Sequence, residues 1–441
     1  MNYLVTFIFF LLANNLICQV QFSELKDWNS VKKQAKTENK LIHLFALSND
    51  CQQCEQVGEF AMNNFMLTEK FNANFINIKA ERKSALFEEI LNSYKSFQLG
   101  YHSIFNSEGF LLHTIYLTAT VPEEYFKFAN QGIENAKYFE TIMEAKSKYL
   151  SSDTKEDLYD YIIKLRKVDN YPIDIMDDYI KKLSNEELNS QQTIVFLQGQ
   201  GSNIYSNTYR FLKTIDQRIK DSLWYLIENK ERAKINNRFR FISQSLIRES
   251  KDENMMKRLV DITKNQYGYS TEGIKYADKM LIEFYKECKM DEKFIQTQIN
   301  FCNQYLMNNS IEDLNRIDEE QRNIAFSNRA KDGKIKFSPP SQFIAMDLNN
   351  AAYTVFEKTN DFYYLNQALI WSKNSIDIIA KSNLSLQKEI PAFYDTYAQI
   401  HHKIGNDKEA LFYQKKAFEL NSTSMIKSEK IIENYNKMIK E

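Results

Sequence analysis

The residues with the clearest chemical potential are Cys51 and Cys54, two thiols that the spacing C-x-x-C holds one helical turn apart. Such a pair can exchange with disulfides, can close a structural disulfide, or can supply part of a tetrahedral zinc site. A zinc site needs further ligands, and His43, His102 and His113 do not show the spacing of a metal motif. We favour thiol–disulfide exchange and keep the structural disulfide and the metal site as alternatives. The predicted site contains no metal and no cofactor.

The segments around the cysteines predict a strand before them and a helix that begins at them. Residues 41–48 form a nearly continuous apolar run, which suits a central strand covered on both faces. A helix is expected from the cysteines to about Phe65, and residues 25–35 show the apolar spacing of an amphipathic helix. Cys51 would lie at a helix N-terminus, where the unpaired N–H groups and the helix dipole favour a thiolate.

The residues that follow predict the rest of a layered domain. We expect a strand at 75–80, a helix at about 84–94, and a hairpin of residues 102–106 and 110–117 that turns at 107–109. Helices that alternate with strands before a final hairpin indicate an α/β domain with a mixed sheet.

These segments resemble the thioredoxin-like superfamily, in particular its exported bacterial members. The resemblance covers about residues 23–135, in a domain placed at 22–135, and is carried by DWNSVKKQAKTENKLIHLF, CQQC, NFINIKAE and NSEG. It implies a thioredoxin fold and a thiol–disulfide oxidoreductase in which Cys51 attacks and Cys54 resolves the mixed disulfide. It also implies that Gln52 and Gln53, which replace the common Gly-Pro, tune the reduction potential.

Other positions depart from the family pattern. Asp50 stands where a tryptophan is usual, and a carboxylate there opposes thiolate formation. Phe45 stands where the family has a buried acid, and His102, or Tyr101 under another gap placement, stands where it has a cis-proline. A cis bond without proline costs about 2.5–4 kcal/mol, so we expect a trans loop there. These departures favour an alternative function, a non-catalytic secreted binding or scaffold protein with a structural disulfide in a degenerate thioredoxin fold.

The N-terminus predicts export. Residues 4–13 are apolar, but this run is shorter than the roughly 20 residues that a membrane-spanning helix needs. We interpret residues 1–19 as a signal peptide cleaved near Cys18 to Gln21, which places the protein outside the cytoplasm, in the periplasm or secreted. A lipid anchor at Cys18 and a buried N-terminal element are the alternatives. No later apolar run is long enough to predict a membrane span.

The rest of the chain predicts helices. The 441 residues include only 10 Gly and 5 Pro, against average usage of about 7% and 5%. Beyond about residue 135, apolar residues recur at helical spacing without a strand pattern. We therefore predict an irregular helical region at 136–335, a break near 331–340, and helical repeats at 341–430. The predicted fold class is an α/β thioredoxin-like domain followed by an all-α helical-repeat domain.

The clearest repeat lies at residues 391–420. Small residues recur there at Ala398, Gly405, Ala410 and Ala417, a pattern similar to a tetratricopeptide repeat. Gly405 should end the first helix. We expect Tyr394, Tyr397 and Phe412 to fill the space between the two helices. Residues 349–378 repeat this logic, with small residues at Ala352, Ala368 and Ser375.

Other candidate sites favour structural roles. Cys288 and Cys302 are more simply two separate small core residues than a disulfide, and Gly199–Gly201 is read as a turn. A net charge of −1 and the lack of a basic run exclude an electrostatic nucleic-acid site. The favoured function is thiol–disulfide exchange on an exported protein substrate, with the helical repeats binding a protein partner.

Overall fold

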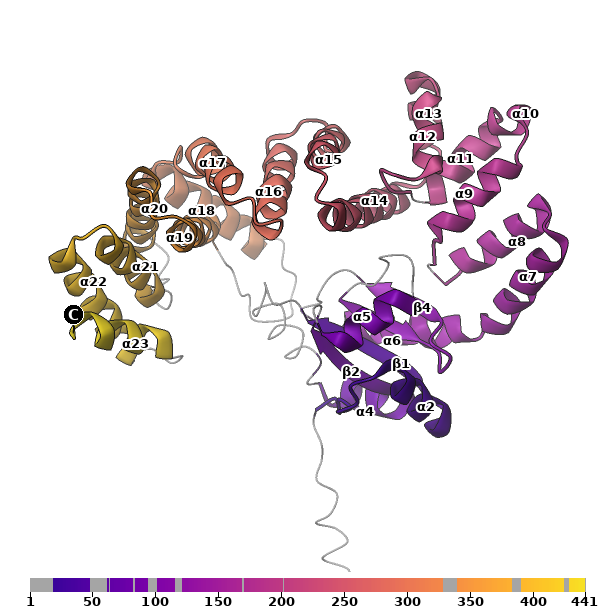
Figure 1. Cartoon of the computed structure of the whole chain (residues 1–441), viewed down its shortest axis with the longest axis horizontal. Helices are drawn as coiled ribbons and strands as arrows, with labels where there is room; N and C mark the ends of the chain where they lie inside the picture. The colour runs from indigo at the N-terminus through magenta and orange to yellow at the C-terminus, as the bar shows by residue number, and fades with distance from the viewer. Residues whose placement is uncertain are drawn as a thin grey trace, which may run out of the picture. The chain divides into compact units, whose positions relative to one another are not determined.

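The computed structural model describes residues 19–47, 62, 64–81, 84–93, 101–115, 121–168, 170–200, 202–327, 339–382, 390–423 and 428–440. The chain forms two compact units, Met1–Leu246 and Ile247–Glu441 (Figure 1). Their boundary falls inside helix α14 (Asn229–Ser250). The predicted signal peptide and the cysteine motif lie outside the described residues, and the domain boundaries at 135 and 335 stay predictions.

The first unit contains a mixed sheet with the strand order β2-β1-β3-β4. Strand β1 (Leu41–Leu47) pairs in parallel with β2 (Phe75–Glu81) and antiparallel with β3 (His102–Phe105), which pairs antiparallel with β4 (Leu111–Ile115). These strands match the expected apolar runs closely. The mixed α/β domain that precedes the helices is therefore confirmed.

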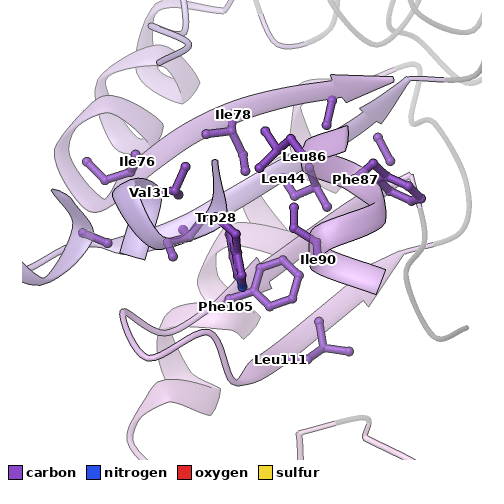
Figure 2. Close-up of a cluster of buried hydrophobic side chains, with 14 residues drawn as sticks. Trp28, Val31, Leu44, Ile76, Ile78, Leu86, Phe87, Ile90, Phe105 and Leu111 are labelled. Carbon is purple, nitrogen blue, oxygen red and sulfur yellow. The ribbon is translucent and has the colours of Figure 1, made fainter. Parts of the chain in front are cut away.

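Helices cover both faces of this sheet. Helix α2 (Trp28–Glu38), whose N-cap is Asp27, and α5 (Ala85–Ser93) pack on one face. The cluster on that face is shown in Figure 2, where the Trp28 ring lies edge-on to Phe105 with their centroids 5.2 Å apart. Helices α4 (Phe65–Asn74) and α6 (Pro122–Ala136) pack on the opposite face. The sheet is thus buried on both sides, as the apolar runs of its central strands require.

Helix α4 was not expected from the sequence. We predicted a helix that begins at the cysteines and ends near Phe65, followed by the strand at 75–80. The Asn64 side chain accepts a hydrogen bond from the Leu67 backbone N–H at 3.3 Å and so caps this helix. Leu67 and Phe71, four residues apart, bury their side chains on the same helix face. A short helix with this few buried apolar positions gives a weak periodic signal.

The remainder of the first unit is helical, and the residues described after Ile115 contain no strand. Its helices are α7 (Phe139–Ser152), α8 (Lys155–Arg166), α9 (Ile173–Lys182), α10 (Asn185–Leu188), α11 (Gln191–Gln200), α12 (Asn207–Thr214), α13 (Gln217–Trp224) and the start of α14. The predicted turn at 199–201 is wrong in part, because Gly199 and Gln200 still belong to α11.

The second unit consists of paired helices. They are α15 (Glu253–Gln266), α16 (Thr271–Glu287), α17 (Asp291–Phe301) with the π-helix η1 (Cys302–Leu306), α18 (Ile311–Ser327), α19 (Pro340–Lys358), α20 (Phe362–Lys381), α21 (Ile390–Lys403), α22 (Asp407–Thr423) and α23 (Glu429–Met438). Cys288 and Cys302 are free, buried thiols, as the favoured interpretation predicted. None of the described helices is long and apolar enough to cross a membrane.

The expected pairs α19/α20 and α21/α22 are present, and Gly405 follows α21 with a φ of 82°. Ala398, Ala410 and Ala417 are buried between helices as predicted. The prediction for Phe412 is wrong, because its side chain is 63% exposed. Tyr413 takes the inner position instead, with its ring centroid 4.7 Å from that of Tyr397, because position 413 falls three residues after Ala410 on the buried face.

Candidate functional site

The structure places part of the predicted site and leaves the rest outside the described residues. Cys51, Cys54 and their neighbours Asp50, Gln52 and Gln53 belong to the part that is not described. The other site positions lie where β1 ends and β3 begins, since Phe45 and His102 are register partners.

The start of β3 is tied to the end of β1. The Ala46 backbone N–H donates to the Tyr101 carbonyl oxygen at 2.8 Å. The described peptide bonds, including the one between Tyr101 and His102, are all trans, as expected from the lack of a proline. Tyr101 and His102 therefore lie beside the end of the strand that leads to the cysteine motif.

Next to these strand ends, a chain of hydrogen bonds crosses the core on the α4/α6 side of the sheet. The Tyr125 hydroxyl of α6 lies 3.3 Å from His102 Nε2 of β3, and His102 Nδ1 lies 3.1 Å from His43 Nε2 of β1. His43 Nδ1 then lies 3.0 Å from Asn77 Oδ1 of β2. All these side chains are buried, and they connect one helix with the three strands β1, β2 and β3.

Hydrogen-bond chemistry fixes the direction of every bond in this chain. The Asn77 Nδ2 group donates to the carbonyl oxygens of Gln21 and Phe71, so the Asn77 Oδ1 atom is the acceptor for His43. His43 therefore carries its proton on Nδ1 and accepts at Nε2. His102 in turn donates from Nδ1 and accepts at Nε2, which makes the Tyr125 hydroxyl the donor at the far end.

Both imidazoles are held neutral by their surroundings. The His102 ring stacks on Phe45 with centroids 4.4 Å apart, and His43 meets the edge of Phe71 at 4.8 Å. Burial lowers the pKa of His43 to about 4, against the opposing effect of its bond to Asn77. Burial, and then repulsion by the nearby His43, holds the pKa of His102 well below its ordinary range.

This arrangement can hold or pass a proton, but as it lies it offers no metal site. The ring nitrogens of both histidines are engaged with each other, with Asn77 and with Tyr125, so no lone pair points to open space. Within the described ranges, no group of three His, Cys, Asp or Glu side chains gathers in a way that could hold a metal ion.

From the sequence, both histidines were weighed as metal ligands and His102 also as the residue at the cis-proline position, but their pairing was missed. One signal was present, since His43 and Phe45 alternate on one face of an apolar strand, and Asn77 takes the same place in the next strand. The contacts with His102 and Tyr125 join residues distant in sequence, and no local pattern indicates them.

The second unit has one notable surface feature, a groove of about 210 Å³ between α16, α17 and α19. Its lining includes Phe294 and Phe301 together with the amide and hydroxyl side chains of Gln298, Asn350 and Thr354. Lys279 and Asp347 form an ion pair across it at 2.7 Å. A groove lined by both apolar and polar side chains is suited to contact with a peptide segment.

The sequence matches no protein-family model, and no curated protein matches it significantly.

Proposed function

We propose that this chain is an exported thioredoxin-like protein that exchanges thiols and disulfides through Cys51 and Cys54. The observation that carries the proposal is the place of the motif in the sheet topology. The motif follows the carboxyl end of β1, whose neighbours β2 and β3 run in opposite directions. In open α/β sheets, binding sites form at the carboxyl end of the strand where the connections change direction.

The strand order and the helices on both faces also support a thioredoxin-like domain. In the proposed reaction, the Cys51 thiolate attacks a substrate disulfide, forms a mixed disulfide and releases the first substrate thiolate. The Cys54 thiolate then attacks the Cys51 sulfur and releases the second substrate thiolate. The products are a reduced substrate and an oxidised Cys51–Cys54 pair, so two electrons have moved from the protein to the substrate.

The helical second unit would bind the protein partner in this proposal. The antiparallel pairs α19/α20 and α21/α22, with small buried residues where the helices meet, support tetratricopeptide-like repeats. Arrays of this kind commonly present extended surfaces to partner proteins. The groove between α16, α17 and α19 is the place where we expect contact.

A second candidate function is a non-catalytic binding protein, and one observation favours it. Phe45 and His102 occupy the positions where the resemblance implies a buried acid and a cis-proline, and they stack on each other in an apolar core. Neither side chain supplies the carboxylate that would take a proton from the resolving thiol.

Reduction of insulin by dithiothreitol distinguishes the two functions. We expect the wild-type chain to accelerate the reaction and Cys51→Ser to abolish the acceleration, while Cys288→Ser, which changes a buried thiol of the second unit, leaves it intact. Equal rates for wild type and Cys51→Ser would reject thiol exchange and favour the binding protein. A mixed disulfide trapped by Cys54→Ser would then identify the substrate, since this variant lacks the resolving thiol.

A further inference from the structure

The hydrogen-bonded series of Tyr125, His102, His43 and Asn77 is enclosed by aromatic rings. This is an unusual environment for two imidazole bases. The rings within 7 Å of the His43 ring centroid include those of Phe22, Phe71, Phe75 and Phe128. Titratable groups that contact this series or the rings around it include Tyr125 of α6, His113 of β4, whose ring lies 5.5 Å from that of Phe128, and Lys79 of β2, whose Nζ lies above the Phe22 ring. The described contacts of the two imidazoles include no carboxylate, so an added proton would meet no counter-ion among them.

The direction of the hydrogen bonds limits how the pair can take up a proton. A protonated His43 would present Nε2–H to the Nδ1–H of His102, so two donors would face each other at 3.1 Å. His102 would have to move its own proton to Nε2, and the Tyr125 hydroxyl would have to turn away and accept. A second proton would leave donors on all the ring nitrogens and two like charges in an apolar core, which breaks the bond between the imidazoles.

We propose that the series of hydrogen bonds from Tyr125 to Asn77 is an acid-operated latch. It holds β3 and α6 against β1 while both imidazoles are neutral, and it releases them when the pair is protonated. The bonds at risk are the one between His43 and His102, which joins β1 to β3, and the one between His102 and Tyr125, which joins β3 to α6. Because Tyr101 and His102 lie beside the strand end that leads to Cys51, release would alter the proposed redox site. This consequence for thiol exchange rests on the proposed function, whereas the latch itself does not.

The sign of the effect follows from the lowered pKa values. An open state exposes the histidines and binds protons with a pKa near 6.5, whereas the closed state binds them only at more acidic pH. The latch is therefore fully stable above about pH 6.5 and weakens as the pH falls toward 4. With a closed-state pKa of about 4 and an open-state pKa near 6.5, His43 alone should raise the opening equilibrium about 20-fold between pH 7 and pH 5, and the lowered pKa of His102 adds to this rise.

Hydrogen exchange followed by mass spectrometry on the full chain tests this proposal. The parent is the Cys51→Ser/Cys54→Ser variant, which cannot perform the proposed reaction, so the latch is tested separately from thiol exchange. After correction for the intrinsic pH dependence of exchange, peptides of β3 and α6 should open at least about 20-fold more at pH 5 than at pH 7. Adding His43→Phe/His102→Phe should remove this change, and adding His402→Gln, which replaces a half-buried histidine of the second unit, should preserve it.

A pH dependence that is unchanged in the double phenylalanine variant would overturn the latch. A second measurement covers the case in which that variant fails to fold. In the parent, the ring proton resonances of His43 and His102 should titrate together at a pH clearly below 6.5, with loss of protection in β3. Titration of either ring near pH 6.5 without that loss would also overturn the proposal.

Discussion

Substitution of Gly132 by alanine should destabilise the contact between α6 and β3, although alanine favours a helix. Gly132 lies in α6 against Ile104 of β3, whose side chain is fully buried. A Cβ atom at position 132 would lie 2.4 Å from Ile104 Cδ1, 3.0 Å from Cγ2 and 3.2 Å from Cβ. Rotation of the flexible Cδ1 would relieve only the first of these contacts, so the helix itself must move away from the strand.

The magnitude follows from two opposing effects. Overpacking of a core costs about 1–3 kcal/mol, and replacing glycine with alanine inside a helix stabilises by about 1 kcal/mol. The net destabilisation of Gly132→Ala should therefore be about 0–2 kcal/mol. Gly199→Ala in α11 is the matched control, because the nearest heavy atom to its added Cβ would be Arg166 Nη2 at 3.7 Å, an ordinary contact. That variant should be stabilised by up to about 1 kcal/mol.

Native-state hydrogen exchange of the α6, β3 and α11 peptides measures both local stabilities in one chain. Ile104→Val removes the Cδ1 atom and should cost about 0.5–1.5 kcal/mol in the wild type, but clearly less in the Gly132→Ala background. The reasoning is refuted if Gly132→Ala stabilises α6 as much as Gly199→Ala stabilises α11. Equal costs of Ile104→Val in both backgrounds would also refute it, since the two positions would then not be in contact.

Three further predictions concern the second unit. Alkylation of the native protein should modify Cys288 before Cys302. Burial raises the pKa of both thiols, and it raises that of Cys302 to about 12. Peptide mapping that shows the reverse order would contradict this prediction. Asp395→Ala removes the carboxylate oxygen that accepts from the Nε2 group of buried Gln414 at 2.6 Å, so it should cost about 1–3 kcal/mol of stability. Faster hydrogen exchange in α22 and α23 would show this loss, and unchanged exchange would contradict it. Gly405→Ala, at a φ of 82°, should cost about 1–2 kcal/mol of α21 stability by the same measurement, and a gain would be contrary to the reasoning.

Sequence patterns predicted elements whose signal is local and missed contacts made by distant residues. Strands β1 and β2 were found because buried central strands consist of nearly continuous apolar residues, whereas the apolar residues of α4 include the exposed Phe65 and Met66, which obscure its helical periodicity. The repeat around Ala410 was found from its small residues, but adjacent aromatic residues left the choice of buried face open, so Phe412 was chosen instead of Tyr413. The histidine pair joins positions 43 and 102, which no local pattern connects. The chemistry of Cys51 and Cys54 stays a prediction.

Two departures from the thioredoxin-like pattern, which appeared separate in the sequence, form one arrangement in the structure. Phe45 and His102 are register partners with stacked rings, so two positions at which the resemblance implies other residues are in direct contact. A carboxylate at position 45 would attract a proton to His102 and place an ion pair in a dry core, where desolvation costs several kcal/mol per ion. Phenylalanine instead keeps the imidazole neutral and able to accept from Tyr125. The proposed latch therefore depends on an apolar side chain at position 45, and Phe45→Asp should disrupt the Tyr125–Asn77 chain.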